Sequence, residues 1–309
     1  MSSSTTVRPG PTRTRSAPER ASKLRGGNVG IWFVLPFLFF FALFLVWPVV
    51  YGLWMSFTNQ SLTGSGSGLA GFANYAEAFA DSEVWRTLGN TVWFTVLSTV
   101  PLVIVALVMA LLVHLGLPGQ WLWRLSFFAP YLLTSTVVSL IWVWMYQPDL
   151  GLINSILGSV GLDGVGWLSN ESLAMWSIAI TTVWWTVGFN FLLYLAALQD
   201  IPAHLYEAAA IDGASGWRRL WSITLPLLKR TTGLILVLQL LASLKVFDQI
   251  YQMTSGGPNG STRSILVYVY DTGFTGYRLG YAAAVSYIFF AIIIIFAIGQ
   301  AKVFTRRES

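Results

Sequence analysis

Few side chains in this chain of 309 residues could take part in chemistry, and Lys245 and Asp248 are the most suggestive of them. They lie, together with Gln239, in a segment that is otherwise apolar. Charges inside a membrane are costly unless they are paired or hydrated, so they usually face a protein interior or a water-filled cavity. At positions i and i+3 of a helix the two side chains could also neutralise each other. The pattern indicates either a hydrated transport path or a structural ion pair near the interface, from which Lys245 can snorkel.

Asn190 lies in another apolar segment and allows two interpretations. Its amide could bond a hydroxyl group of a substrate, or it could tie two helices together, and the neighbouring Gly188 would allow close packing in either case. Trp142 and Trp144 belong to an aromatic cluster that fits an interfacial belt, or a surface on which a sugar ring stacks. The candidate substrate path therefore consists of Asn190, Gln239, Lys245 and Asp248.

Other kinds of chemistry are not indicated. The chain has no cysteine, which excludes a disulfide framework, a thiolate metal site and a cysteine nucleophile. Its two histidines, His114 and His204, belong to different segments, so we expect no metal site. No G-x-x-x-x-G-K-[ST] sequence occurs, so nothing here can hold ATP phosphates as a P-loop does. We expect no catalytic residues and no cofactor in this chain.

The elements that position these residues are predicted to be membrane helices. Apolar residues make up 55% of the chain and charged residues only 10%, against about 25% in an average globular domain. The mean hydropathy is +0.64. Roughly twenty apolar residues cross a bilayer. The sequence thus predicts an all-α integral membrane protein with six spans, at Ile31–Phe57, Leu88–Leu115, Leu125–Tyr146, Leu173–Leu198, Thr231–Met253 and Tyr281–Lys302.

The distribution of charge predicts the orientation. Lys and Arg concentrate in the N-terminal tail, around Arg124, between Arg218 and Arg230, and at the C-terminus, whereas the other connections are richer in Asp and Glu. Basic residues stay on the cytoplasmic side, so both termini are expected there. The net charge of +5 is then a sign of topology, and nucleic-acid binding is not expected. Residues 1–28 are predicted to be a disordered cytoplasmic tail, and residues 29–305 the six-span domain.

The connection 200–226 is predicted to form a helix–turn–helix elbow beneath the membrane. Asp200 would cap a first helix that runs to about Ile211, and Asp212 and Gly213 would form the turn. Ser215 would cap a second helix from Gly216 to about Thr224, which Pro226 would prevent from continuing.

Within this elbow, Glu207-Ala208-Ala209 is followed after three residues by Gly213, and after nine more by Ile223-x-Leu225-Pro226. This spacing resembles the EAA signature of the inner-membrane permeases of binding-protein-dependent ABC importers. The resemblance implies the type I permease fold of those importers. It also implies that the loop couples the membrane domain to an ATPase, through Glu207, Ala208, Ala209, Asp212, Gly213, Ile223, Leu225 and Pro226.

Two further stretches resemble the carbohydrate-uptake permeases, of the group that contains the large maltose permease and the first glycerol-3-phosphate permease. One is Thr254-Ser255-Gly256-Gly257-Pro258, in which Ser255 replaces the usual first glycine. The other is Pro148-x-x-Gly151-x-x-Asn154 with Trp167-Leu168. The resemblance covers about residues 30–305 and implies a sugar or sugar derivative as the transported solute, without identifying it.

The resemblance also implies partners. They are a second permease subunit that makes a heterodimer, a dimer of ABC ATPases that bind ATP and Mg, and an extracytoplasmic solute-binding protein. Uptake would proceed by alternating access, with the elbow moved by the ATPases. The alternatives are a secondary transporter driven by an ion gradient, in which Lys245 and Asp248 would be the coupling charges, and a membrane enzyme, which would need clustered acids that the sequence does not show.

Overall fold

The computed structural model describes residues 29–64, 68–116 and 118–305. Within these ranges the regular elements are helices, and β-structure is limited to one isolated bridge between Thr58 and Leu69. The described chain falls into two units, one ending at Val50 and the other beginning at Tyr51. The predicted tail 1–28 lies outside the described residues, as does the middle of the glycine–serine stretch, residues 65–67.

Five stretches of helix are long and apolar enough to cross a membrane, among the described residues, and they confirm most of the predicted spans. The first comprises α1 (Val29–Phe41), η1 (Ala42–Val46) and α2 (Trp47–Ser56), and from Phe33 onward most of its apolar side chains are exposed. The others are α4 (Ser82–His114), α8 (Glu171–Gln199), the helix Gly216–Leu244 and α14 (Leu279–Thr305). Helix α4 begins where Asp81 accepts a hydrogen bond from the Glu83 N–H group at 2.9 Å.

The predicted third span, Leu125–Tyr146, is not one straight helix. The chain forms α5 (Gln120–Phe128) and η2 (Ala129–Leu132), and then α6 (Ser135–Met145), with a bend of 98° between the two parts. Pro130 lacks an N–H group and cannot continue α5, and Thr134 caps the new helix by accepting a bond from the Val137 N–H group. Counted as one broken span, this pair raises the number of candidate spans to six.

The predicted fifth span, Thr231–Met253, is also broken. Helix α11 (Leu225–Leu244) ends before Lys245, and α12 (Asp248–Thr254) begins three residues later. Ser264 donates a hydrogen bond of 3.0 Å to the carbonyl of Val246, which lies in this gap. Irregular backbone is tolerated at membrane depth only where other groups satisfy it, so the contact from a distant segment permits the break.

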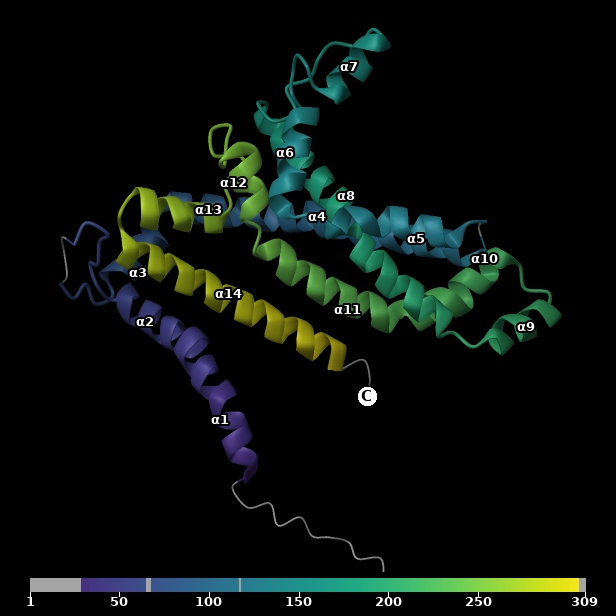
Figure 1. The fold of residues 1–309 in the computed structure, drawn as a ribbon, viewed down its shortest axis with the longest axis horizontal. Helices are drawn as coiled ribbons and strands as arrows, with labels where there is room; N and C mark the ends of the chain where they lie inside the picture. Colours follow the sequence, from purple (N-terminus) through teal and green to yellow (C-terminus); the bar gives the residue numbers. More distant parts are fainter. Residues whose placement is uncertain (1–28, 65–67, 117, 306–309) are drawn as a thin grey trace, which may run out of the picture. The chain divides into compact units, whose positions relative to one another are not determined.

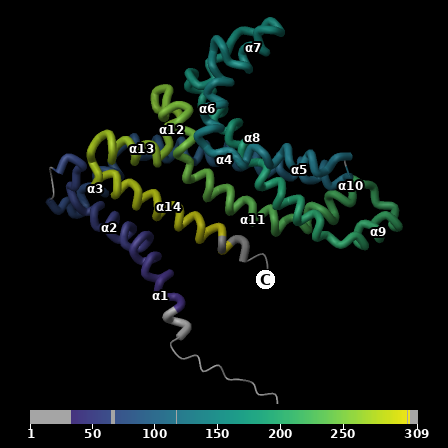
Figure 2. Tube along the Cα trace, viewed as in Figure 1, coloured from purple at the N-terminus to yellow at the C-terminus, as the bar shows by residue number. Residues whose placement is uncertain are grey.

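Helices α4, α8 and α11 pack together around one of the cores, although they are widely separated in the sequence (Figure 2). Phe191 and Tyr194 of α8 are fully buried against Ala106 and Ala110 of α4 and Leu228 of α11. Small residues at such contacts let membrane helices approach closely. At Gly188 of α8 an added Cβ atom would lie 2.3 Å from the Phe127 carbonyl oxygen, which confirms close packing there.

A second group of short helices surrounds the ends of α4 and α14 (Figure 1). It comprises α3 (Ala73–Ala80), α13 (Ile265–Tyr270) and η4 (Asp271–Thr275), while α7 (Leu152–Ser159) follows α6. Tyr268 and Tyr281 donate hydrogen bonds of 2.5 and 2.7 Å to the Asp81 carboxylate. Burial raises the pKa of Asp81, but these bonds and the Glu83 N–H group outweigh it and leave the pKa below its ordinary value.

Candidate functional site

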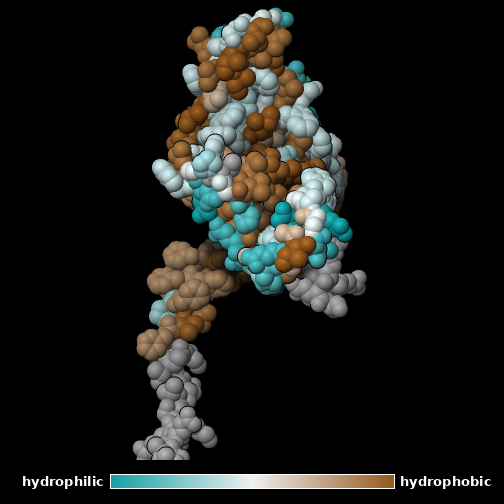
Figure 3. Space-filling view, turned by 90° about the vertical axis from the view of Figure 1, so that its right-hand side faces the viewer, coloured by the Kyte–Doolittle hydropathy of each residue, from teal (hydrophilic) through white to brown (hydrophobic). Residues whose placement is uncertain are grey.

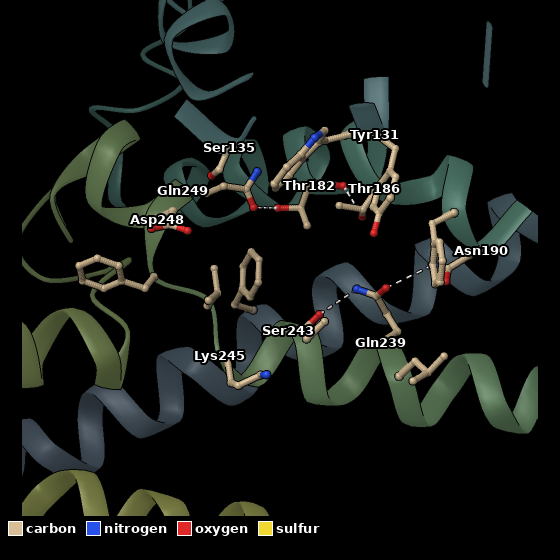
Figure 4. Close-up of a pocket in the computed structure, with 17 residues that line it drawn as sticks. Tyr131, Ser135, Thr182, Thr186, Asn190, Gln239, Ser243, Lys245, Asp248 and Gln249 are labelled. Carbon is tan, nitrogen blue, oxygen red and sulfur yellow. Dashed lines mark hydrogen bonds between the residues drawn. The ribbon is translucent and has the colours of Figure 1, made fainter. Parts of the chain in front are cut away.

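A cavity of about 320 Å³ opens where the chain leaves α11 (Figure 4). Its walls come from Phe94 of α4, from η2 and α6, from the middle of α8, and from the last turns of α11 together with the joining segment and the start of α12. All four residues of the predicted substrate path line it. The polar side chains in its wall are Tyr131, Ser135, Thr182, Thr186, Asn190, Gln239, Ser243, Lys245, Asp248 and Gln249.

Asn190 and Gln239 belong to a chain of hydrogen bonds that links three helices. The Asn190 amide donates to Gln239 Oε1 at 3.1 Å, and the Gln239 amide donates to Ser243 Oγ at 3.1 Å. Ser243 Oγ lies 2.9 Å from Ser98 Oγ of α4. Asn190 is only 1% exposed. The structure therefore shows Asn190 in the helix-linking role that the sequence left open, and places the same amides in the cavity wall.

Lys245 and Asp248 do not neutralise each other, as the ion-pair interpretation of their i and i+3 spacing would require. Among the described residues they form no salt bridge, and both side chains are exposed. In Figure 4 the Lys245 ammonium group points away from Asp248. The cause is the break after α11, because the spacing i to i+3 brings side chains together only within a continuous helix. The cavity thus has one cationic and one anionic group in its lining.

Gln249 is one of six polar residues of the cavity that the sequence analysis missed; the others are Tyr131, Ser135, Thr182, Thr186 and Ser243. It is 5% exposed, and its Oε1 atom accepts a hydrogen bond of 2.9 Å from Thr182. Its Nε2 atom is buried without a partner among the described residues, as is the hydroxyl group of Ser135. A buried donor left unpaired costs about 1–3 kcal/mol. The signal in the sequence was a glutamine next to Asp248 and four residues after Lys245, a spacing that places both side chains on one face of a helix.

Aromatic side chains complete the wall, although they are not the predicted ones. Trp185 and Phe189 of α8 line the cavity, and the Phe189 ring stacks on Tyr131 with centroids 5.4 Å apart. Trp142 instead packs against its own helix and α8, and Trp144 is 54% exposed. Neither Trp142 nor Trp144 is among the residues that line the cavity.

The loop that carries the EAA-like signature forms an elbow beyond the ends of α8 and α11 (Figure 1). Its first helix is α9 (Ala203–Ile211), which includes Glu207. We had expected Asp200 to cap this helix, and that prediction was wrong. Asp200 instead ends α8, because the chain stays helical up to Gln199. Gly213 has φ of +74°, the left-handed conformation predicted for the turn. Ser215 accepts a hydrogen bond from the Arg218 N–H group and caps the next helix, also as predicted.

The second half of the elbow differs from the prediction, because Pro226 does not end it. Helix α10 (Gly216–Arg219) continues through the π-helical turn η3 (Leu220–Thr224) into α11. In η3 the Leu225 N–H group bonds to the Leu220 carbonyl, so the turn is wider than an α-helical one. Pro226 follows as the second residue of α11, directly after this wider turn.

This continuity links the loop to the cavity. Thirteen residues separate Pro226 from Gln239, which at 1.5 Å per residue is a rigid helix of about 20 Å. Tyr206 of α9 and Thr224 of η3 are 3.0 Å apart through their hydroxyl groups, which ties the two helices of the elbow together. The second half of the elbow and part of the cavity wall therefore belong to one continuous helix.

Much of the elbow faces outward. Glu207, Ala208, Asp212 and Gly213 are exposed, and Ile211 is 87% exposed. Figure 3 looks onto the side where α9 and α10 lie in Figure 1, and it shows hydrophilic residues gathered there next to hydrophobic surface. Such a surface has the polar and apolar character of a protein interface. Ile223 and Leu225 are partly buried within the continuous helix.

Known proteins match both this elbow and the fold that contains it. Residues 85–308 match the family described as "Binding-protein-dependent transport system inner membrane component". The chain belongs to this family. The resemblance seen in the sequence is thereby confirmed, together with the multi-span helical fold of an importer permease.

Several relatives of this permease have stated solutes. The sulfoquinovosyl glycerol permease SmoG of Agrobacterium fabrum is 35% identical over 265 residues, covering 85% of this chain and 86% of its own. The trehalose/maltose permease MalF of Thermococcus litoralis is 35% identical and covers 91% and 95%. The sn-glycerol-3-phosphate permease UgpA of Rhizobium meliloti is 36% identical and covers 84% and 87%.

Among solved structures, the permease is similar to a chain of a bacterial ABC transporter that imports the acidic polysaccharide alginate. The TM-score is 0.79 at 25% identity, covering 89% of this chain and 94% of the other. A second structure of an alginate transporter, in complex with a periplasmic protein that holds an alginate pentasaccharide, gives a TM-score of 0.75. Family membership places the permease in the inner membrane; the side on which its termini lie stays a prediction.

Proposed function

We propose that this permease imports a sugar or sugar derivative and that the cavity at the end of α11 holds the solute during its passage. The observation that carries the proposal is the Gln249 amide, which is buried in the cavity wall with an unpartnered donor. The stated solutes of the relatives, which are sugars, a sugar glycerol, a glycerol phosphate and a polysaccharide, support the same class.

The chemistry of the cavity suits a carbohydrate. Amide and hydroxyl groups such as those of Gln249 and Ser135 can exchange hydrogen bonds with sugar hydroxyl groups. The rings of Trp185 and Phe189 offer flat apolar faces to the CH groups of a sugar ring. The volume of about 320 Å³ is at the lower end of the range for small-molecule sites, so the cavity suits a small solute or part of a larger one.

The elbow 200–226 is proposed to bind a separate ABC ATPase, which holds ATP and Mg. Glu207, Ala208, Ala209, Asp212 and Gly213 would form the contact, and the small alanine side chains would allow close approach. The exposed Ile211 side chain supports a partner at this surface, since a fully exposed isoleucine gains most by being covered. Ile223, Leu225 and Pro226 would pass the movement to α11 as the ATPases close, giving alternating access.

The remaining parts of the transporter would be a second, different permease and an extracytoplasmic solute-binding protein. The elbow and both termini would then lie in the cytoplasm of a prokaryotic cell, as the basic residues predict. The alternative driven by an ion gradient is not retained, because the family is one of binding-protein-dependent systems.

The test is co-purification of the tagged permease from native membranes, comparing wild type with Glu207→Ala and Gly213→Asp, followed by mass spectrometry. Wild type should retain an ATPase, and both variants should lose it at unchanged abundance in the membrane. Solute uptake should stop with vanadate and persist with an ionophore. Retention of no ATPase by wild type after gentle solubilisation, together with uptake that vanadate leaves unchanged, would contradict the proposal.

A further inference from the structure

A second amphipathic cavity, of about 540 Å³, lies far from the first, between the end of α4 and the beginning of the helix Gly216–Leu244. The two helices are candidate spans, so their ends mark the boundary of the membrane. The cavity is lined by Leu111, His114, Leu115, Tyr206, Gly216, Trp217, Arg219, Leu220 and Thr224. None of these residues has a place in the solute path proposed above.

Arg219 is the charged group of this cavity. Its Nε atom is buried without a hydrogen-bond partner, and among the described residues its guanidinium group forms no salt bridge. A buried guanidinium donor that lacks an acceptor is costly, and a phosphate group is the acceptor that its forked geometry fits best.

The rest of the lining is what an amphiphile requires. Leu111, Leu115 and Leu220 are apolar, whereas Tyr206 and Thr224 bring hydroxyl groups to the same cavity. Trp217 is 70% exposed and packs edge-on against Trp221, with centroids 5.7 Å apart. Exposed tryptophans beside basic residues are typical of the headgroup level of a membrane. A soluble anion would gain nothing from the leucines, and this distinguishes a lipid from free phosphate.

A path for the acyl chain is also present. Leu107, one turn of α4 nearer to the middle of the membrane than Leu111, lines a neighbouring cavity of about 800 Å³. Leu225 and Leu236 of α11 line that cavity too. Leucine side chains of α4 therefore line both cavities in turn, and Lys229 and Arg230 also line the second one.

We propose that this cavity is a binding site for an anionic phospholipid, with the lipid phosphate on Arg219 and an acyl chain along the leucines of α4. Tyr206 of α9 and Thr224 both line the cavity, and their hydroxyl groups lie 3.0 Å apart. A lipid in the cavity would therefore contact α9 through Tyr206. A lipid here would brace the elbow against the membrane. The proposal stands on the cavity and its charge, and does not depend on the solute or on the ATPase contact.

The experiment is native mass spectrometry of the whole transporter, purified with its partners, and titrated with phosphatidylglycerol and with phosphatidylcholine of the same acyl chains. Wild type should bind phosphatidylglycerol in preference. Arg219→Gln should weaken that binding about five-fold or more, the effect expected for one cation at the headgroup level. Arg219→Lys, which keeps the charge, should retain most of it. Arg218→Gln is the matched control, because Arg218 does not line the cavity. This variant should bind phosphatidylglycerol as wild type does.

Several outcomes would overturn the proposal. One is equal binding of phosphatidylglycerol and phosphatidylcholine by wild type. Another is an equal loss of phosphatidylglycerol binding in Arg219→Gln and Arg218→Gln, which would show a diffuse charge effect. Displacement of phosphatidylglycerol by millimolar inorganic phosphate would indicate a free-anion site. Loss of the ATPase from Arg219→Gln with phosphatidylglycerol retained would assign the arginine to a carboxylate of that partner.

Discussion

Replacing Gln249 by leucine separates a role in solute binding from a role in folding. The substitution keeps the size of the side chain and removes both polar atoms. The one hydrogen bond lost inside the protein is that from Thr182, whose hydroxyl group is also 2.8 Å from the Ile178 carbonyl and can donate there instead. Removing the unpartnered Nε2 donor offsets this loss, so the free energy of unfolding should change by less than about 1 kcal/mol.

Binding should respond much more strongly. A hydrogen bond between the Gln249 amide and a sugar hydroxyl group contributes about 1–1.5 kcal/mol, which corresponds to a rise in KM of about five- to ten-fold. The assay is uptake of labelled solute into proteoliposomes that contain the whole transporter, at several solute concentrations. Thermal unfolding of the same preparations in detergent reports stability.

Gln252→Leu provides a matched control in the same helix. Gln252 lies three residues further along α12, donates a hydrogen bond of 3.2 Å to Thr136, and does not line the cavity. Its loss should leave KM unchanged. The reasoning would be refuted if Gln249→Leu left KM at the wild-type value, or if the two variants raised it equally. A fall in unfolding temperature without a change in KM would show that the amide is structural.

Three other predictions concern packing, the elbow and pH. Gly188→Ala should destabilise the protein by about 2 kcal/mol or more, since its Cβ would lie 2.3 Å from the Phe127 carbonyl oxygen, whereas Gly158→Ala, with open space around it, should be neutral by thermal unfolding. Gly213→Val should cost about 1–2 kcal/mol locally, because φ is +74°, and should reduce ATPase activity stimulated by the solute-loaded binding protein; an unchanged stimulation would refute this. The lowered pKa of Asp81 gives a stabilisation that is complete above its ordinary value of 3.8 and lost as the pH falls through the folded-state pKa. Unfolding of Asp81→Asn should accordingly depend less on pH below about pH 4 than that of wild type, and parallel pH profiles would count against the assigned contacts.

The sequence alone determined the features that depend on local properties of the chain. Long apolar runs identify most of the spans. A segment that crosses lipid must bond all its backbone N–H and C=O groups internally, which a helix does, and its side chains must be apolar. The turn at Gly213 and the cap at Ser215 were predictable from single residues, since each conformation is available to few side chains. The spacing from Glu207 to Pro226 was enough to identify the family.

Tertiary structure decided where those helices break and therefore where the candidate site lies. The gap after α11 depends on Ser264, a residue far along the chain that donates to the Val246 carbonyl. That contact lies in the gap that separates Lys245 from Asp248, and no periodicity in the segment itself records it. Likewise, Pro226 suggested the end of a helix, but the π-helical turn before it lets the helix continue. The local sequence pattern specifies which residues can be helical. Contacts between distant segments determine where a helix can break, because they bond the carbonyl groups that the break leaves without a helical partner. The candidate cavity lies at such a break.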